Sequence, residues 1–214
     1  MIKDKSLYLV ISEEYGKSRS AVEIAQGAIK GGVDMIQMRE KSRPRSELLE
    51  LGKKLSRLCK ENGVKFIVND DPDIARQTDA SGVHLGQDDI LKHPVEGVRE
   101  LLGRDKLIGV STHSPEEFRR ANGLDVDYIA FGPIFKTKTK DYFIGSNDIG
   151  PVVSIARKPV FFIGGIDLSN IGDVLNKGAK NIALIRAITE AEDIASKTRE
   201  FKERIMTHDT KDKR

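Results

Sequence analysis

Short apolar runs of four or five residues recur along the whole chain, and more polar segments with a helical spacing of apolar residues separate them. Most of the runs show no alternation of polar and apolar positions, which is typical of strands that are buried on both faces of a parallel sheet. We therefore predict eight strands. They lie at Leu7–Ile11, Met35–Met38, Lys65–Val68, Gly82–Leu85, Leu107–Val110, Tyr128–Phe131, Val160–Ile163 and Asn181–Ile185.

The clearest helical pattern lies at Pro44–Asn62. Leucines recur there at intervals of three, four and three residues from Leu48 to Leu58, so they share one helix face. Pro44 suits the first helical position, and Gly63 ends the pattern. The other predicted helices lie near Arg19–Lys30, Pro72–Thr78, Pro94–Leu102, Pro115–Ala121, Asn147–Ala156, Ser169–Asn176 and Glu192–Ile205.

Eight strand–helix repeats in one chain of 214 residues predict a single-domain (β/α)₈ TIM barrel of the α/β class. A doubly wound open sheet is the alternative. No linker or change of composition divides the chain. We assign residues 1–206 to the barrel and expect residues 207–214 to form a frayed polar tail.

Three polar clusters directly follow the second, third and fourth predicted strands. They are Gln37–Lys41, Asn69–Asp71 and Gly86–Asp89. In a barrel these positions share the carboxyl-terminal mouth, where such proteins keep their active sites. The cations at alternate positions of the first cluster suit phosphate oxygens, and carboxylates from separate strands suit a hard divalent cation. Together the clusters predict a metal–diphosphate site.

Two pairs of neighbouring aspartates need separate interpretations. Asp71 precedes Pro72 and fits the N-cap of the next helix, so we favour Asp70 as the metal ligand. For Asp88 and Asp89 the spacing alone leaves the choice open.

Gly164 and Gly165 follow the seventh strand, where the fold commonly binds phosphate through backbone N–H groups. A plain tight turn is the alternative, and we expect Ser169 to cap the helix that follows. The lysine-rich loop after the sixth strand has the length of an active-site lid.

Two histidines lie near the predicted mouth. His84 falls within a strand, where a structural role in the barrel interior is the better interpretation. His113 lies just beyond the fifth strand, so a ligand or acid–base role and a positioning role both stay open.

The composition narrows the choice of partners. Charged residues make up 32% of the chain, yet the net charge is only +3, which argues against a nucleic-acid or membrane surface. No stretch reaches the ~20 apolar residues of a membrane span. The single cysteine, Cys59, excludes an internal disulfide and favours the cytosol. A homo-oligomer stays open.

The ordered motifs resemble those of the thiamine-phosphate synthase family, from the first strand to the end of the eighth. The motifs are Gln37-x-Arg39-Glu40-Lys41, Val68-Asn69-Asp70-Asp71, Gly82-Val83-His84-Leu85-Gly86-Gln87-x-Asp89, Gly109-Val110-Ser111-x-His113, Gly132-Pro133-Ile134-Phe135-x-Thr137-x-Thr139-Lys140 and Ile163-Gly164-Gly165-Ile166. The resemblance implies a Mg²⁺-dependent transferase of thiamine biosynthesis. This enzyme joins a hydroxymethylpyrimidine diphosphate to a thiazole phosphate, or its carboxylated form, giving thiamine monophosphate and pyrophosphate.

The same resemblance implies roles for individual residues. The pyrimidine diphosphate would be held by Gln37, Arg39, Lys41, Asn69 and Lys140, with Ser111 near the pyrimidine and the pyrophosphate. Mg²⁺ would bind Asp70 and Asp89. The thiazole phosphate would bind Thr137, Thr139, Gly165 and the strand end around Ile185. Catalysis would fall to Arg39, Lys41, Ser111 and Lys140, which act on the leaving group without a strong base or nucleophile.

Two features depart from the family pattern. Residues 141–148 are bulkier than the small and proline residues expected there, and Arg186 stands where many members have a small residue or serine. Two rival functions remain: a thiazole tautomerase, which shares the barrel but performs acid–base chemistry, and a non-catalytic barrel that binds phosphate ligands.

Overall fold

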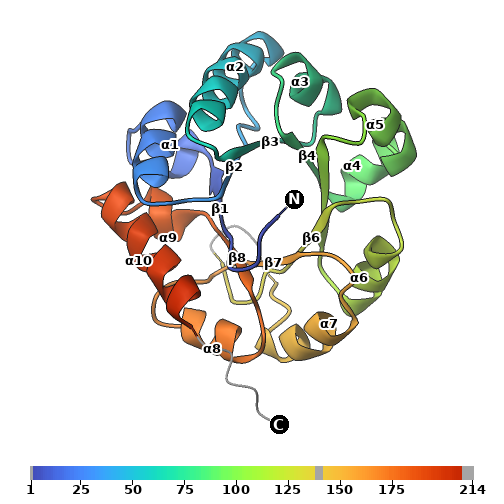
Figure 1. The fold of residues 1–214 in the computed structure, drawn as a ribbon, viewed down its shortest axis with the longest axis vertical. Coiled ribbons are helices and arrows are strands. Elements are labelled where there is room, and N and C mark those ends of the chain that lie inside the picture. The colour runs from blue at the N-terminus through green and yellow to red at the C-terminus, as the bar shows by residue number, and fades with distance from the viewer. Residues whose placement is uncertain (1, 138–141, 209–214) are drawn as a thin grey trace.

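Eight parallel strands close into a barrel in the computed structural model, which describes residues 2–137 and 142–208 (Figure 1). Each strand pairs with its neighbours in chain order, and β1 pairs with β8 to close the sheet. This confirms the predicted (β/α)₈ barrel and excludes the open sheet. The strands are β1 Leu7–Ile11, β2 Met35–Met38, β3 Lys65–Asn69, β4 Gly82–Leu85, β5 Leu107–Thr112, β6 Tyr128–Phe131, β7 Val160–Ile163 and β8 Asn181–Leu184.

The helices form a ring around the barrel (Figure 1). They are α1 Ala21–Lys30, α2 Arg45–Glu61, α3 Pro72–Gln77, α4 Gln87–Lys92, α5 Val95–Leu102, α6 Pro115–Asn122, α7 Ile149–Ile155, α8 Ile171–Asn176, α9 Arg186–Thr189 and α10 Ile194–Thr207. Two short 3₁₀ helices add to the ring, η1 Glu13–Tyr15 and η2 Ser146–Asp148.

Buried side chains form two layers. The outer layer lies between the strands and the helices and includes Leu55 and Cys59 of α2. The inner layer fills the barrel itself and is made of Tyr8, Met35, Ile67, Tyr128, Phe161 and Ala183. Burial on both faces explains why the strands carry apolar residues at successive positions.

Several helix starts differ from the predictions. Helix α8 begins at Ile171, and Ser169 donates a hydrogen bond to Asp167 instead of capping the helix, so the predicted cap was wrong. Pro44 is the N-cap of α2 and not its first residue. The helices α4 and α9 are too short to show a repeating apolar pattern, and neither was predicted.

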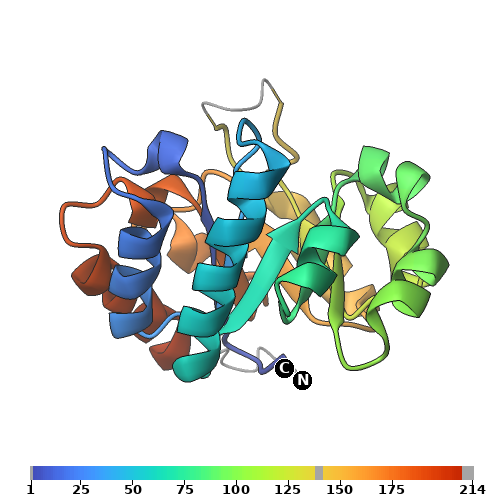
Figure 2. The same cartoon turned by 90° about the horizontal axis from the view of Figure 1, so that it is seen from above.

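The start and the end of the described chain meet at the amino-terminal end of the barrel. The Lys5 ammonium donates to the carbonyls of Met206 and His208, at 2.8 and 3.1 Å. Figure 2 shows the N-terminal segment on the side opposite the segments that flank residues 138–141. Helix α10 ends at Thr207, and residues 209–214 of the expected tail lie outside the described residues.

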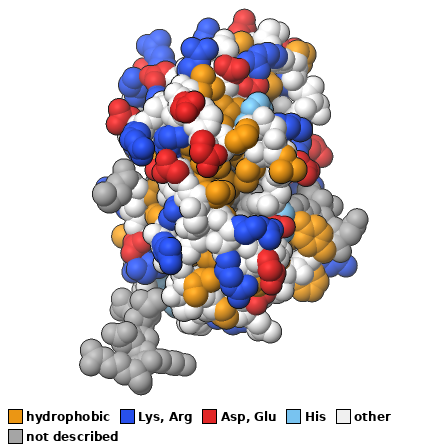
Figure 3. All heavy atoms as spheres, turned by 90° about the vertical axis from the view of Figure 1, so that its right-hand side faces the viewer, with side chains coloured by type: hydrophobic (Ala, Val, Ile, Leu, Met, Phe, Trp, Pro, Cys, Tyr) orange, Lys and Arg blue, Asp and Glu red, His pale blue; other side chains and the backbone are white. Residues whose placement is uncertain are grey.

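The described surface carries no dominant charge on the face drawn in Figure 3, where Lys and Arg side chains are interspersed with Asp and Glu. None of the helices in the described ranges is long and apolar enough to cross a membrane.

Candidate active site

The three polar clusters lie side by side at the carboxyl-terminal mouth because β2, β3 and β4 are neighbours in the barrel. The parallel register brings Gln37 beside Ile67 and Asn69 beside His84, so each strand ends at a similar height. The mouth is the edge at which the sequence placed the site.

Asp70 and Asp89 face each other at this edge. Asp70 follows β3 in a left-handed conformation with φ 63°, and its N–H donates to the His84 carbonyl at 2.8 Å. Burial, followed by a hydrogen bond and charge repulsion from Asp89, raises the pKa of Asp70 to about 6. The charge of Lys41 and a hydrogen bond to the Asn69 side chain act in the opposite direction. The four side chains therefore converge.

The other two aspartates take different positions. Asp71 is the N-cap of α3, because its carboxylate accepts from the Ile74 N–H at 2.8 Å, and it also pairs with Arg45. Asp88 is exposed. The structure thus confirms the predicted cap and turns Asp89 toward Asp70. Asp89 also accepts from the Gly86 N–H at 3.3 Å, which supports the start of α4.

The pair of carboxylates fits Mg²⁺ better than a metal that needs a complete protein cage. Among residues 2–137 and 142–208 no group of three or more His, Cys, Asp and Glu side chains could hold a metal ion. Mg²⁺ commonly binds through one or two carboxylates and completes its shell with water and substrate phosphates. Asp70 and Asp89 have the ligand type and the number that such a partial shell would require.

We expect Asp70→Asn to stabilise the metal-free protein by about 1 kcal/mol at pH 7, after solvent screening of a half-buried group is allowed for. The raised pKa means that the folded wild type holds a proton that the unfolded chain releases near pH 4. Wild-type stability therefore falls as the pH rises from about 4 to about 6, whereas Asp70→Asn lacks this loss. Asparagine also tolerates the left-handed backbone.

Urea unfolding at pH 4 and pH 7, with and without Mg²⁺, measures this difference. The gain of Asp70→Asn over wild type should appear only at the higher pH, and Mg²⁺ should stabilise wild type alone. A less stable Asp70→Asn protein at pH 7 without Mg²⁺ would contradict the repulsion between the two carboxylates.

The acid of the first cluster bonds to η1, whereas the charge of Lys41 acts on Asp70 at the mouth. The Glu40 carboxylate accepts from the Glu13 N–H at 2.7 Å, and Glu13 in turn pairs with Arg43. Because Glu40 is held by η1, it does not bridge Arg39 and Lys41. No side chain in the described residues pairs with the Arg39 guanidinium, which is half-buried, so this cation is available to an anion.

His113 is held by backbone contacts. Its ring Nδ1–H donates to the Gly132 carbonyl at 2.6 Å, and its backbone N–H donates to the Glu117 carboxylate at 2.6 Å. These bonds fix the ring beside β6, and its edge faces Tyr142 at 6.1 Å between centroids. The bond to Gly132 places the ring proton on Nδ1 and fixes the orientation of the ring, which both a positioning role and acid–base chemistry require.

Gly164 and Gly165 form a backbone cradle after β7. Their φ values are 100° and 66°, and a Cβ on Gly165 would lie 2.7 Å from the Lys136 carbonyl oxygen. Only glycine suits this turn. Thr137 lies on the adjoining segment and Ile185 at the end of the neighbouring β8. Thr139 and Lys140 lie outside the described residues.

Arg186 turns toward η1. Its guanidinium lies 4.1 Å from the centroid of the Tyr15 ring, and its Nε is 3.6 Å from Glu190. The Arg186 charge, which departs from the family pattern, is thus held by the Tyr15 ring and the Glu190 carboxylate.

The contacts of two residues in the predicted clusters, and the role of two tyrosines, were missed from the sequence. Gln37 is only 3% exposed and donates to the Tyr8 hydroxyl at 2.5 Å, so it lies in the barrel interior below the mouth. Gln87 donates to the Ser111 carbonyl at 2.5 Å and thereby ties α4 to the end of β5. In the sequence, Tyr8 of β1 and Tyr128 of β6 resemble ordinary core residues. The one signal was Gly109, because a glycine within a strand often marks the close approach of another group.

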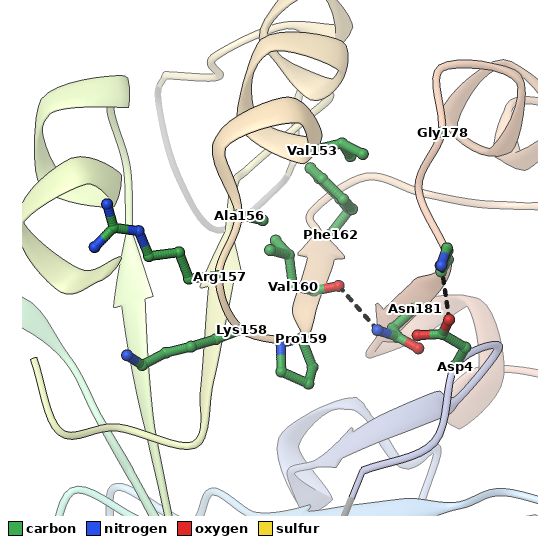
Figure 4. A pocket seen from close by; sticks show the side chains of 11 residues that line it. Asp4, Val153, Ala156, Arg157, Lys158, Pro159, Val160, Phe162, Gly178 and Asn181 are labelled. Carbon is green, nitrogen blue, oxygen red and sulfur yellow. Dashed lines mark hydrogen bonds and ion pairs between the residues drawn. The ribbon is translucent and has the colours of Figure 1, made fainter. Parts of the chain in front are cut away.

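A cavity of about 350 Å³ lies at the opposite, amino-terminal end, between α7 and β8 (Figure 4). Arg157 and Lys158 point away from Asp4 and Asn181 in this view, and Asn181 already donates to the Val160 carbonyl. Lys180 likewise pairs with Asp4 at 2.7 Å, so these polar groups of the lining are already engaged and the cavity is not a second candidate site.

Comparisons with known proteins agree with this geometry. A family model described as thiamine monophosphate synthase matches residues 7–188. The thiamine-phosphate synthase of Pelotomaculum thermopropionicum is 44% identical over 92% of this chain and 90% of its own. That of Halalkalibacterium halodurans is 41% identical over 90% and 92%. A solved thiamine phosphate pyrophosphorylase from Pyrococcus furiosus is 34% identical, with a TM-score of 0.84 over 94% of this chain and 97% of that one.

Proposed function

Because this chain belongs to the thiamine monophosphate synthase family, we propose that its barrel mouth joins a hydroxymethylpyrimidine diphosphate to a thiazole phosphate and releases pyrophosphate. The product is thiamine monophosphate. The observation that carries the proposal is the convergence of Asp70, Asp89, Lys41 and Asn69. Arg39, which no described side chain pairs with, lies two residues along the chain from Lys41. This set suits a diphosphate–metal complex, and it would be costly to retain in a barrel that bound only a monophosphate.

The reaction follows from the chemistry of the two substrates. The bond between the pyrimidine methylene carbon and the diphosphate oxygen breaks, and both electrons leave with pyrophosphate. The electron-rich aminopyrimidine stabilises the resulting cation, and the thiazole nitrogen then supplies the electron pair of the new C–N bond. No side chain needs to act as a nucleophile, which agrees with a mouth of cations, carboxylates and hydroxyls.

The protein's task is to stabilise negative charge as it grows on the leaving group. Arg39 offers a planar fork for two phosphate oxygens, and Lys41 offers a compact charge beside Asp70. We assign Ser111 to the same group, at the end of β5. The resemblance adds Lys140 to this set.

Asp70 and Asp89 would hold Mg²⁺ in this proposal. The ion, when bound, neutralises charge on the pyrophosphate oxygens. The two carboxylates also exclude a diphosphate that arrives without a cation, because like charges would then face each other.

The thiazole phosphate occupies the other side of the mouth in our proposal. Gly165 supplies a backbone N–H after β7, and Thr137 and Ile185 lie on the adjoining segments, while the resemblance adds Thr139. The two subsites lie on opposite arcs of one barrel, since β2–β4 serve the first and β6–β8 serve the second. The buried, unpaired Cys59 suits the cytosol, which we propose as the compartment.

The experiment is to mix the protein with both substrates and to follow thiamine monophosphate and pyrophosphate, with Mg²⁺ and with excess EDTA. Stoichiometric formation of both products that requires Mg²⁺ supports the proposal. Isomerisation of a thiazole phosphate without any condensation would favour the tautomerase, and binding without turnover would favour the non-catalytic barrel.

A further inference from the structure

A chain of hydrogen bonds crosses the barrel interior beneath the mouth and joins two residues of the proposed pyrimidine subsite. It begins at Gln37 on β2, whose Nε2 donates to the Tyr8 hydroxyl at 2.5 Å. The Tyr8 and Tyr128 hydroxyls lie 3.0 Å apart, and the Tyr128 hydroxyl lies 3.1 Å from His84 Nδ1. The chain ends where His84 Nε2 meets the Ser111 hydroxyl at 2.8 Å.

Gly109 makes this path possible. A Cβ at this position would lie 2.0 Å from the Tyr128 ring, so the ring of β6 occupies the place of a β5 side chain. Tyr128 thereby reaches His84 on β4 and stacks against it at 5.5 Å between ring centroids. The absence of a side chain at Gly109 therefore allows the Tyr128 hydroxyl to reach the His84 imidazole.

Counting protons gives the chain one direction. The Gln37 amide nitrogen only donates, so the Tyr8 hydroxyl oxygen accepts from it, and the Tyr8 O–H donates its hydrogen bond to Tyr128. Tyr128 then donates to His84 Nδ1, which leaves the His84 proton on Nε2, directed at Ser111. The Ser111 oxygen accepts that bond, and its own proton is free to point elsewhere.

Burial supports the single-proton state of each member. His84 is only 6% exposed and both of its ring nitrogens meet hydroxyl groups, and burial disfavours the charged imidazolium, so the ring carries one proton. Burial also raises the pKa of both tyrosines, so both hydroxyls keep their protons.

We propose that Tyr8, Tyr128 and His84 form a one-way hydrogen-bond relay that holds the Ser111 hydroxyl as a donor toward the mouth of the barrel. His84 is then a positioning residue, and Ser111 presents its proton to the leaving pyrophosphate. This last step rests on the proposed function, whereas the direction of the relay does not. The reverse direction requires the Gln37 amide to be turned over, and it leaves Ser111 donating to His84.

The test of direction is the tautomer of His84, measured by ¹⁵N NMR of the histidine rings in the free protein at pH 7. The His84 signal is assigned by single substitutions of the other histidines, His93, His113 and His208. We expect the Nε2–H tautomer. The Nδ1–H tautomer in the unaltered protein would overturn the relay, whatever the enzyme's activity, and this measurement needs no variant of the relay itself.

Two matched variants each remove one hydroxyl. Tyr128→Phe removes the donor to His84, so the Nε2–H tautomer should be lost or mixed. Tyr8→Phe removes a hydroxyl one link earlier and leaves Tyr128 donating to His84, so the tautomer should stay. The same tautomer in both variants as in the unaltered protein would overturn the relay.

The activity test is a double-mutant cycle. Tyr128→Phe should lower kcat about 10-fold, as expected for a weakened donor to the transition state, and it should cost nothing further in a Ser111→Ala background. An equal loss in both backgrounds would assign Tyr128 a merely structural role and overturn the link to Ser111. Failure of all variants and of wild type to form product, with the tautomer as expected, would count against the proposed function and not against the relay.

Discussion

Asp89→Asn and Asp70→Asn should each lower the rate of thiamine monophosphate formation by about 10²–10³, because each removes half of the protein's hold on the cation beside the leaving group. This corresponds to roughly 3–4 kcal/mol of transition-state stabilisation. The fold should survive, since both side chains lie at the mouth and not in the core. The measurement is the initial rate with both substrates saturating, over a series of Mg²⁺ concentrations.

Asp88→Asn is the matched control, because it makes the same chemical change on the adjacent, exposed residue. It should keep the wild-type rate and the wild-type dependence on Mg²⁺. Full activity of both mouth variants in excess EDTA would remove Asp70 and Asp89 from the metal site.

Arg39→Ala should lower kcat/KM for the pyrimidine diphosphate by about 10²-fold, whereas His113→Gln should stay within about 10-fold of wild type. The Arg39 guanidinium is unpaired within the described chain, and water cannot replace its planar fork. The synthase reaction needs no acid–base histidine, so the removal of His113, whose ring donates to the Gly132 carbonyl, should cost positioning and no essential proton. An essential acid–base histidine would instead be worth ~10²–10⁴.

Arg45→Ala serves as the control for Arg39. Arg45 is also a cation near the mouth, but it pairs with the capping Asp71, so its loss should leave the rate unchanged. A collapse of activity in His113→Gln beside a nearly unaffected Arg39→Ala would favour the tautomerase mechanism over the synthase.

The strands and the edge of the barrel that carries the site could be predicted from the sequence. Doubly buried parallel strands have a distinctly apolar composition, and β1, β2, β4, β6 and β7 have the bounds that the pattern predicted. Asp70 and Asp71 could be separated as well, since a following proline marks a helix start. The resemblance implied that Asp70 and Asp89 act together, whereas their spacing alone did not, because their contact depends on the pairing of β3 with β4.

The short elements and the interior chain could not be predicted. Helix α4 has a Leu91 that is 81% exposed, so it shows no apolar face that periodicity could detect. Ser169 resembles an N-cap in sequence, yet the N-cap of α8 is Asn170, one residue later, and the helix begins at Ile171. Tyr8 and Tyr128 are apolar by pattern. What their hydroxyls meet depends on the register of β5 and β6, which no local pattern encodes.

The junction of Lys5 with Met206 and His208 has a consequence for how the protein can be handled. Both ends of the described chain lie at the amino-terminal end of the barrel, its foot, and every candidate catalytic group in that chain lies at the carboxyl-terminal mouth. A tether, tag or fused domain attached at either end therefore leaves the mouth open to both substrates. The same proximity suits circular permutation, in which a short linker joins the old ends and the chain is reopened at an exposed turn near the foot, such as that at Gly103.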